Sequence, residues 1–318
     1  MVKYIIKRII TIILIFFGLT LVIYLLLSCV PGGNAAEREI QTLISGGTMP
    51  SDEQIQAIYA KYGLDKNVFM QYIAWLGNVF TGTWGNTYSN LSVTVIEAIG
   101  NKIGPTLILM GSGLLIAIVF GVLLGTLSAL KPNGIADTSC TVLTFLGSSI
   151  PGFLISVVCV YVFSVQLGWL PSGYSPAKPY FACLLMPMLI VAFTHIGGFI
   201  KQTRGSVMDV MNEEYVKTAK AKGLSYPVVV GKHMLRNAAL PICANIALSV
   251  PTLVGGSIVI ERIFSWPGLG NYLVTCLLNK DIPVVMGIVS LIIIVVLVAN
   301  LVLDLVYAAL DPAIRARR

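Results

Sequence analysis

Residues that could carry out chemistry are few in this sequence. The nearest approach to a phosphate-binding loop is Gly197-Gly198-Phe199-Ile200-Lys201, which has the wrong spacing for GxxxxGK(S/T) and runs out of an apolar segment. The sequence has no HExxH motif, no GxSxG motif and no cluster of His or Cys with metal-ligand spacing. We therefore expect a protein that is not an enzyme, with no catalytic residue, no cofactor and no metal site of its own.

Isolated polar residues in apolar segments are the remaining candidates. A lone His such as His195 could be a ligand, but is more often a satisfied packing residue. Asp304 is the one acid inside a predicted membrane span; we favour a structural bond over a functional role, because it lies near the end of the span. A proton-coupled carrier would place more acids in its spans, and deeper ones. The cysteines form no CxxC pair and behave as small hydrophobes: Cys29, Cys140, Cys159, Cys183, Cys243 and Cys276.

Composition decides the broad class of protein. Of the 318 residues, 56% are hydrophobic and 11% are charged, whereas a soluble domain carries roughly a quarter charged residues. The net charge of +7 could indicate nucleic acid, yet the Lys and Arg residues are scattered near the ends of apolar runs. The sequence therefore predicts an all-α integral membrane protein that binds the lipid bilayer and no nucleic acid.

About six apolar runs are long enough to cross a bilayer. The first follows Lys3, Lys7 and Arg8 and reaches Cys29, which also resembles a lipoprotein signal; we favour a span because the run is long and more spans follow. We divide the chain into a first segment and span at 1–30, an extracytoplasmic region at 31–102 and a membrane core at 103–318, whose polar loop is 201–241. The expected spans are roughly 9–30, 106–130, 138–165, 181–200, 242–260 and 283–310.

Glycine and proline mark places where the spans depart from plain helices. Gly121 and Gly125 form a GxxxG pair that lets another helix approach, either in ordinary packing, which we favour, or in a dimer. The segment 147–152 should interrupt the third span, either as a structural kink or where the backbone lines a transport pathway. The candidate pathway residues are Ser148, Ser149 and Pro151 there, and Gly255 and Gly256 in the fifth span.

The region 31–102 has mixed polarity. Ser51, before the acidic residues Asp52 and Glu53, predicts the start of a helix that runs to about Tyr62. The aromatic residues and turn formers that follow indicate a helix lying at the membrane interface and then turns. This region is too short for an independent enzyme domain.

The polar loop from Glu213 to Pro241 is the most informative stretch. It predicts a helix as far as Ala221, a stop at Gly223, and a second amphipathic run closed by Leu240 and Pro241. With six spans, this loop and both termini lie on the same side of the membrane, and that side carries fourteen of the 21 Lys and Arg residues. By the positive-inside rule this side is the cytoplasmic one. A helical loop between two spans, without an energy source of its own, indicates a transport subunit moved by a separate protein. A stand-alone carrier or sensor and a membrane hydrolase are the alternatives.

This loop resembles the EAA loop of ATP-binding-cassette importer permeases, in the dipeptide, oligopeptide and nickel branch. The residues that carry the resemblance there are Glu214-Tyr215-Val216, Thr218-Ala219, Ala221-Lys222-Gly223-Leu224, His233, Leu235-Arg236-Asn237-Ala238 and Leu240-Pro241. Elsewhere they are Pro31-Gly32, Gly63-Leu64-Asp65, Gln71-Tyr72, Trp75, Glu261, Phe264 to Gly270, Asp281, Pro283, Asp304, Tyr307 and Asp311-Pro312. The sequence departs from the family pattern at Lys217-Thr218-Ala219, in place of Glu-Ala-Ala, and at Gly82 to Thr87.

The resemblance implies a type I importer permease in a bacterial or archaeal cell membrane. Its partners would be a second similar permease subunit, two cytoplasmic ATPases that hold ATP and magnesium, and an external binding protein for peptides, nickel or another small solute. Docking on an ATPase would involve Glu213, Glu214, Tyr215, Thr218, Ala219, Ala221, Lys222, Gly223 and Leu224. Arg236, Asn237 and Pro241 would return the chain to the fifth span. The region 31–102 and the loop 261–272, with Glu261, Trp266 and Gly268, would meet the binding protein or shape an outer gate.

Overall fold

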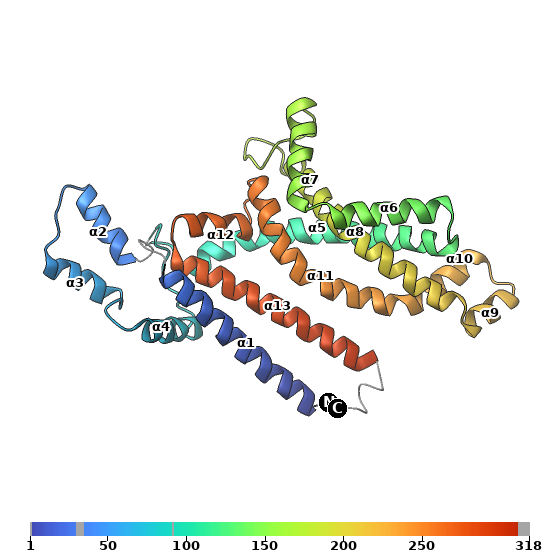
Figure 1. Cartoon of the computed structure of the whole chain (residues 1–318), viewed down its shortest axis with the longest axis horizontal. Helices are drawn as coiled ribbons and strands as arrows, with labels where there is room; N and C mark the ends of the chain where they lie inside the picture. Colours follow the sequence, from blue (N-terminus) through green and yellow to red (C-terminus); the bar gives the residue numbers. More distant parts are fainter. Residues whose placement is uncertain (1, 30–34, 91, 311–318) are drawn as a thin grey trace. The chain divides into compact units, whose positions relative to one another are not determined.

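The structure is a computed structural model that describes residues 2–29, 35–90 and 92–310. Within these ranges the regular elements are helices, and the only bridge between extended residues joins Asn86 to Thr94. Pro31-Gly32, Asp311-Pro312 and the side chain of Tyr307 lie outside what is described. The helices in Figure 1 are α1 (Val2–Ser28), α2 (Ala35–Ser45), α3 (Asp52–Lys61), α4 (Val68–Phe80), α5 (Val95–Leu130), α6 (Ile135–Ser149), α7 (Gly152–Cys159), the π-helix η1 (Val160–Gln166), α8 (Tyr180–Met211), α9 (Glu214–Ala221), α10 (Tyr226–Val228), the π-helix η2 (Val229–Leu235), α11 (Arg236–Ile263), α12 (Leu269–Leu278) and α13 (Ile282–Leu310).

Five of the described helices are long and apolar enough to cross a membrane, and a bent pair makes a sixth candidate. The five are Ile6–Ser28, Val95–Leu130, Tyr180–Met211, Pro241–Ile263 and Ile282–Asp304. This agrees with the expected number of spans.

Two of the expected boundaries were wrong. Helix α5 begins at Val95 rather than near Thr106, and α8 continues to Met211 rather than ending near Ile200. The extension of α8 keeps a buried stripe at Thr203, Ser206 and Val207. This i, i+3, i+4 spacing continues the helix although the local sequence has become polar.

The third span is interrupted where the sequence predicts it. Helix α6 ends at Ser149, α7 begins at Gly152, and the axis of α6 differs by 98° from that of the helical stretch Gly152–Gln166, which comprises α7 and η1. Between them Ile150 is extended, with φ −93° and ψ 121°. The pyrrolidine ring of Pro151 accounts for this conformation, because it disfavours helical backbone at the preceding residue.

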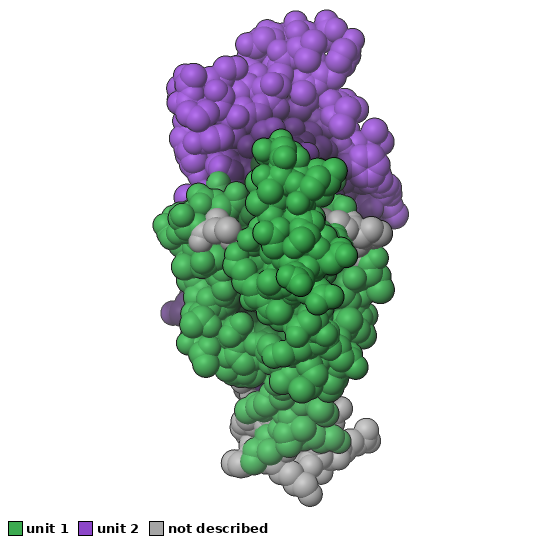
Figure 2. All heavy atoms as spheres, turned by 90° about the vertical axis from the view of Figure 1, so that its left-hand side faces the viewer, with its two compact units in different colours: residues 1–104, 268–297 green, residues 105–267, 298–318 purple. Residues whose placement is uncertain are grey.

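The chain divides into two compact units, which Figure 2 distinguishes by colour. Unit 1 comprises residues 1–104 and 268–297. Its helix α4 packs on α1 through Tyr72, whose hydroxyl lies 2.9 Å from Thr20 Oγ1 and donates to Phe17 O at 3.1 Å. Helix α3 begins as predicted, because Ser51 and Gln54 form a reciprocal capping box.

Unit 1 also contains a helix where a loop was expected. The interval 261–272 was predicted to be a loop, but Leu269 begins α12, and Glu261 still belongs to the last turn of α11. The buried residues Leu269, Leu273 and Cys276 follow helical spacing, which the neighbouring glycines concealed. Before α13, the buried Asp281 accepts hydrogen bonds from the backbone N–H groups of Tyr88 and Ser89, both at 3.0 Å.

Unit 2, residues 105–267 and 298–318, is organised around α8, which contacts α6, α7 and α11 (Figure 1). Glycines of α5 also face α8. A Cβ on Gly113 would lie 2.5 Å from Val191 Cγ1, one on Gly121 would meet Phe199, and one on Gly125 would lie 2.7 Å from Ile200 O. The predicted close approach at the GxxxG pair is thus to a helix of the same chain.

Candidate functional site

Helix α9 forms the core of the polar loop. Glu214 in its first turn and Lys220 in its last turn both suit the helix dipole. The helix ends at Ala221, and Gly223 has φ +75° while its N–H donates to Lys220 O at 3.0 Å. The predicted helix stop at Gly223 is confirmed, because glycine adopts this left-handed conformation without the steric cost of a Cβ.

One face of α9 is held by an apolar cluster. Val216 and Ala219 are the inward residues and are 0% and 4% exposed. They pack with the ends of α5 and α8, with η2 and with the start of α11. We call this set the anchor cluster: Ala129, Val207, Val216, Ala219, Val229, Met234 and Ala238.

The other face of the loop is open. Glu214, Lys217, Thr218, Lys220 and Ala221 of α9 are exposed, as is the following residue Lys222. Large apolar side chains are exposed in the same loop, at Tyr215, Leu224, Tyr226 and Val228. A short, anchored helix that presents both basic and apolar side chains can bind another protein. We call these residues the outward face of the loop.

The return to the fifth span differs from the prediction. The second amphipathic run was expected to close at Leu240 and Pro241, but α11 begins at Arg236 and continues through both residues. Proline removes only one backbone hydrogen bond here, and such losses are tolerated in membrane helices whose neighbours support the backbone. Asn237 stabilises the joint with η2, because its Nδ2 donates to His233 O at 2.8 Å.

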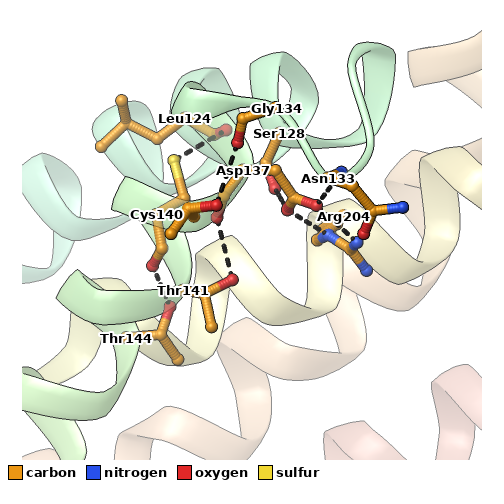
Figure 3. Close-up of polar contacts among 10 residues, drawn as sticks. Leu124, Ser128, Asn133, Gly134, Asp137, Cys140, Thr141, Thr144 and Arg204 are labelled. Atoms are coloured by element: carbon orange, nitrogen blue, oxygen red, sulfur yellow. Dashed lines mark hydrogen bonds and ion pairs between the residues drawn. The ribbon is translucent and has the colours of Figure 1, made fainter.

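Figure 3 shows a group of polar contacts around Asp137 and Arg204, and Arg204 precedes the anchor-cluster residue Val207 by three positions on α8. No motif in the sequence indicated this group. Asp137, in the first turn of α6, is 4% exposed. Its Oδ1 accepts from Arg204 Nε at 2.7 Å, and its Oδ2 accepts from Arg204 Nη2 at 2.9 Å. It also accepts from Ser128 Oγ and, at 2.8 Å, from the N–H of Asn133. One carboxylate therefore joins α8, the end of α5 and the turn before α6.

The sequence contained a usable sign of this group. Asp137 is an acid at the start of a predicted span, and Arg204 is a base at the end of another. Both lie at the side of the membrane that the distribution of Lys and Arg predicts to be cytoplasmic. Neither residue belongs to a recognised motif. Only the fold brings them together across 67 positions.

The candidate pathway and gate residues occupy different environments. Ser148, Ser149 and Pro151 are exposed at the break between α6 and α7, and Gly255 and Gly256 are exposed on α11, which runs through them without interruption. Gly268 precedes α12 in unit 1. Glu261 and Trp266 are both 0% exposed, so these two residues are part of a packed core rather than of an open surface.

The core around Glu261 and Trp266 is held by specific contacts within unit 2. Thr106 Oγ1 donates to Glu261 Oε1 at 2.8 Å, and Trp266 Nε1 donates to Pro105 O at 2.9 Å. The indole ring also packs against Tyr180, with 5.1 Å between the ring centroids. His195 is similarly engaged, since its Nδ1 lies 3.0 Å from Val191 O.

Comparison with known proteins identifies the family of this chain. Residues 118–316 match the family described as binding-protein-dependent transport system inner membrane component, and residues 1–97 match the N-terminal region of such components. The chain belongs to this family. It is an all-α, multi-pass permease component of the inner membrane.

Individual relatives match this permease component from end to end. A Brucella ovis protein named as a peptide permease is 38% identical over 322 residues, which cover 99% of each chain. The oligopeptide transport system permease protein AppB of Bacillus subtilis is 34% identical, and the glutathione transport system permease protein GsiC of Escherichia coli is 33% identical; both alignments cover 99% of each chain. Among solved structures, an inward-facing MetNI methionine ABC transporter matches with a TM-score of 0.50 at 14% identity, over 65% of this chain and 95% of that one. The last match supports the type I importer permease fold.

Proposed function

We propose that this permease component forms, with a second similar permease subunit, a membrane pathway that imports peptides. The observation that carries the proposal is the end-to-end match to relatives named as peptide, oligopeptide and glutathione permeases. These names favour peptides over nickel or another small solute. The family description also favours a multi-subunit system with a separate binding protein over a stand-alone carrier.

We infer that the outward face of the loop binds an ATPase subunit in the cytoplasm. Two such ATPases would hold ATP and magnesium and supply the energy. The anchor cluster supports this role, because a helix packed against the ends of α5, α8 and α11 cannot move without moving them. The basic residues of the loop support a cytoplasmic location.

On the same proposal, the region 31–102 faces outward and meets the binding protein. A cavity of about 890 Å³ in unit 1 supports this, since it opens among aromatic and amide side chains of this region, including Trp75 and Asn78, with Tyr24 of α1 also in its lining. Labelling of single cysteines placed at Lys66 and at Lys217 tests the orientation. A membrane-impermeant reagent added outside should label the first position only, and the reverse pattern would overturn the topology.

The test of the proposed function is uptake of a radiolabelled oligopeptide into proteoliposomes that contain the four membrane-associated subunits, with the binding protein added outside. We expect ATP-dependent uptake that requires every subunit. Leu224→Asp should abolish retention of the ATPases during purification, because it places a charge on the outward face where Leu224 is 41% exposed. Met49→Asp, at a residue that is 85% exposed in the region 31–102, is the matched control and should retain them. ATPase retention by the Leu224 variant would contradict the docking role.

A further inference from the structure

The buried carboxylate of Asp137 connects parts of the fold that the proposed mechanism requires to move together. Its partners lie on the end of α5, on the turn before α6 and on α8. Two parallel N–H to O bonds from Arg204 give the connection a defined direction. The rigid guanidinium fork gives such a bidentate pair geometric specificity as well as energy.

Arg204 is directly linked to the anchor cluster. It is followed on α8 by Val207, which is 0% exposed and packs in that cluster with Val216 and Ala219 of α9. One turn of continuous helix therefore separates the ion pair from the side chains that hold α9. This turn is a continuous path along which a displacement of α9 would be passed to Arg204.

On the other side of the ion pair, α6 leads to the break at 150–151. Two further contacts keep α6 on α8 along the way. A Cβ on Gly197 would lie 3.0 Å from Thr144 Cα, and one on Gly147 would lie 2.8 Å from Phe193 O. Asp137, Thr144 and Gly147 thus hold α6 on α8 at successive levels, up to the point where the helix breaks.

We infer that Asp137 and Arg204 form a positioning pair that transmits motion of the ATPase-docking loop to the broken helix α6–α7. The inference rests on the proposed function, because it takes α9 as the site where work enters. The pair stays closed throughout the transport cycle and keeps α6 and α8 in register. Loss of the pair leaves ATP hydrolysis intact and reduces the peptide transported per ATP hydrolysed.

The experiment compares the same molecules with and without a covalent cross-link between positions 137 and 204. Asp137→Cys and Arg204→Cys are combined in a chain whose exposed cysteines Cys29 and Cys243 are replaced by Ser. The two new thiols are joined by a short linker that contains a reducible bond, and the linked chain is reconstituted with its partner subunits. Peptide uptake and ATP hydrolysis are then measured before and after reduction, with the Cys29 and Cys243 double variant alone as the control for the reductant.

The linked complex should couple uptake to hydrolysis as the control does, and reduction should lower uptake per ATP at least fivefold while hydrolysis changes less than twofold. Equal coupling before and after reduction would overturn the inference. So would a linked complex that is inactive until reduced, because the pair would then have to open during the cycle. Failure of the docking role is a separate result, since it appears as ATPase retention in the Leu224→Asp variant.

A matched variant keeps the inference testable by simple substitution. Asp137→Asn preserves the size of the side chain but removes the charge that Arg204 faces, and it should lower uptake per ATP. Glu39→Gln makes the same chemical change at another ion pair, between α2 and α3, and should leave uptake per ATP unchanged. An equal effect of the two substitutions would contradict a specific role for Asp137.

Discussion

The ion pairs Asp137–Arg204 and Glu39–Lys61 have similar lengths but different surroundings. Their shortest N–O distances are 2.7 Å and 2.9 Å. The Asp137 and Arg204 side chains are 6% and 33% exposed, whereas those of Glu39 and Lys61 are 33% and 58% exposed. Asp137 also accepts two further hydrogen bonds, one from Ser128 at the end of α5 and one from Asn133 in the turn before α6. The two pairs therefore differ in burial and in the number of segments that they connect, and not in distance. The buried pair contributes to the organisation of the fold, whereas the other pair lies on its surface.

Glycines show the same contrast between the two regions. In unit 2 three glycines of α5, Gly113, Gly121 and Gly125, allow close approach, because an added Cβ would meet atoms of α8. In the region 31–102, Gly63, Gly82 and Gly85 instead have positive φ and open space around the position of a Cβ. One region uses glycine to pack helices and the other uses it to turn the chain.

The largest expected effect tests packing at Gly125. Gly125→Ala should destabilise the chain by about 3 kcal/mol, at the upper end for overpacked cores, because the new Cβ would lie 2.7 Å from a backbone oxygen. Gly111→Ala on the same helix has open space and should be neutral or slightly stabilising. Thermal unfolding in detergent compares the two, and equal midpoints would contradict the packing role of Gly125.

The second prediction compares the two ion pairs by stability. Asp137→Asn should lower the thermal midpoint of the detergent-solubilised chain, because Arg204 loses its negative partner in a mostly buried site. Glu39→Gln should leave the midpoint unchanged within error, since water screens that pair. A larger shift for Glu39→Gln would reverse the comparison.

The third prediction compares two turn glycines. Gly223 and Gly63 have φ +75° and +66°, and at neither position would an added Cβ have another atom within 4 Å. Replacement of either by Val should therefore cost about 1–2 kcal/mol through backbone strain alone. Only Gly223→Val should also uncouple ATP hydrolysis from uptake, because it alters the end of α9. Unchanged coupling in that variant, measured in proteoliposomes, would separate the turn from the docking role.

The smallest effect concerns the charge state of Glu39. The hydrogen bond from Lys61 is the main reason that the pKa of Glu39 lies below its ordinary value, and the same bond raises the pKa of Lys61. The stabilisation by Glu39 is complete above its unfolded pKa of about 4.3, and is lost as the pH falls through the lower pKa of the folded state. The contribution of Lys61 is lost only as the pH rises through its raised pKa.

Lys61→Ala should move the pKa of Glu39 back up toward its ordinary value. An NMR titration of the detergent-solubilised chain, isotopically labelled at Glu, measures this shift. Lys66→Ala is the control, because Lys66 is not the ion-pair partner of Glu39. If the pKa of Glu39 does not change in the Lys61→Ala variant, the exposed pair contributes nothing to the free energy of unfolding.

Local patterns in the sequence were sufficient for features that depend on a few neighbouring residues. The apolar runs indicated the membrane class and the number of spans, since bilayer thickness dictates their length. Pro151 indicated the break, Ser51 the start of α3 and Gly223 the end of α9, because each acts through the backbone within one turn of its own position.

The tertiary structure decided which helices pair and how far they extend. Helix α8 continues to Met211 because Thr203, Ser206 and Val207 find a packed surface, and α11 passes through Pro241 because η2 and the anchor cluster support its start. The bond between Asp137 and Arg204 could not be derived from either residue alone. A carboxylate becomes an organising contact only when the fold removes it from water and places donors around it, and these donors come from three separate segments of the chain.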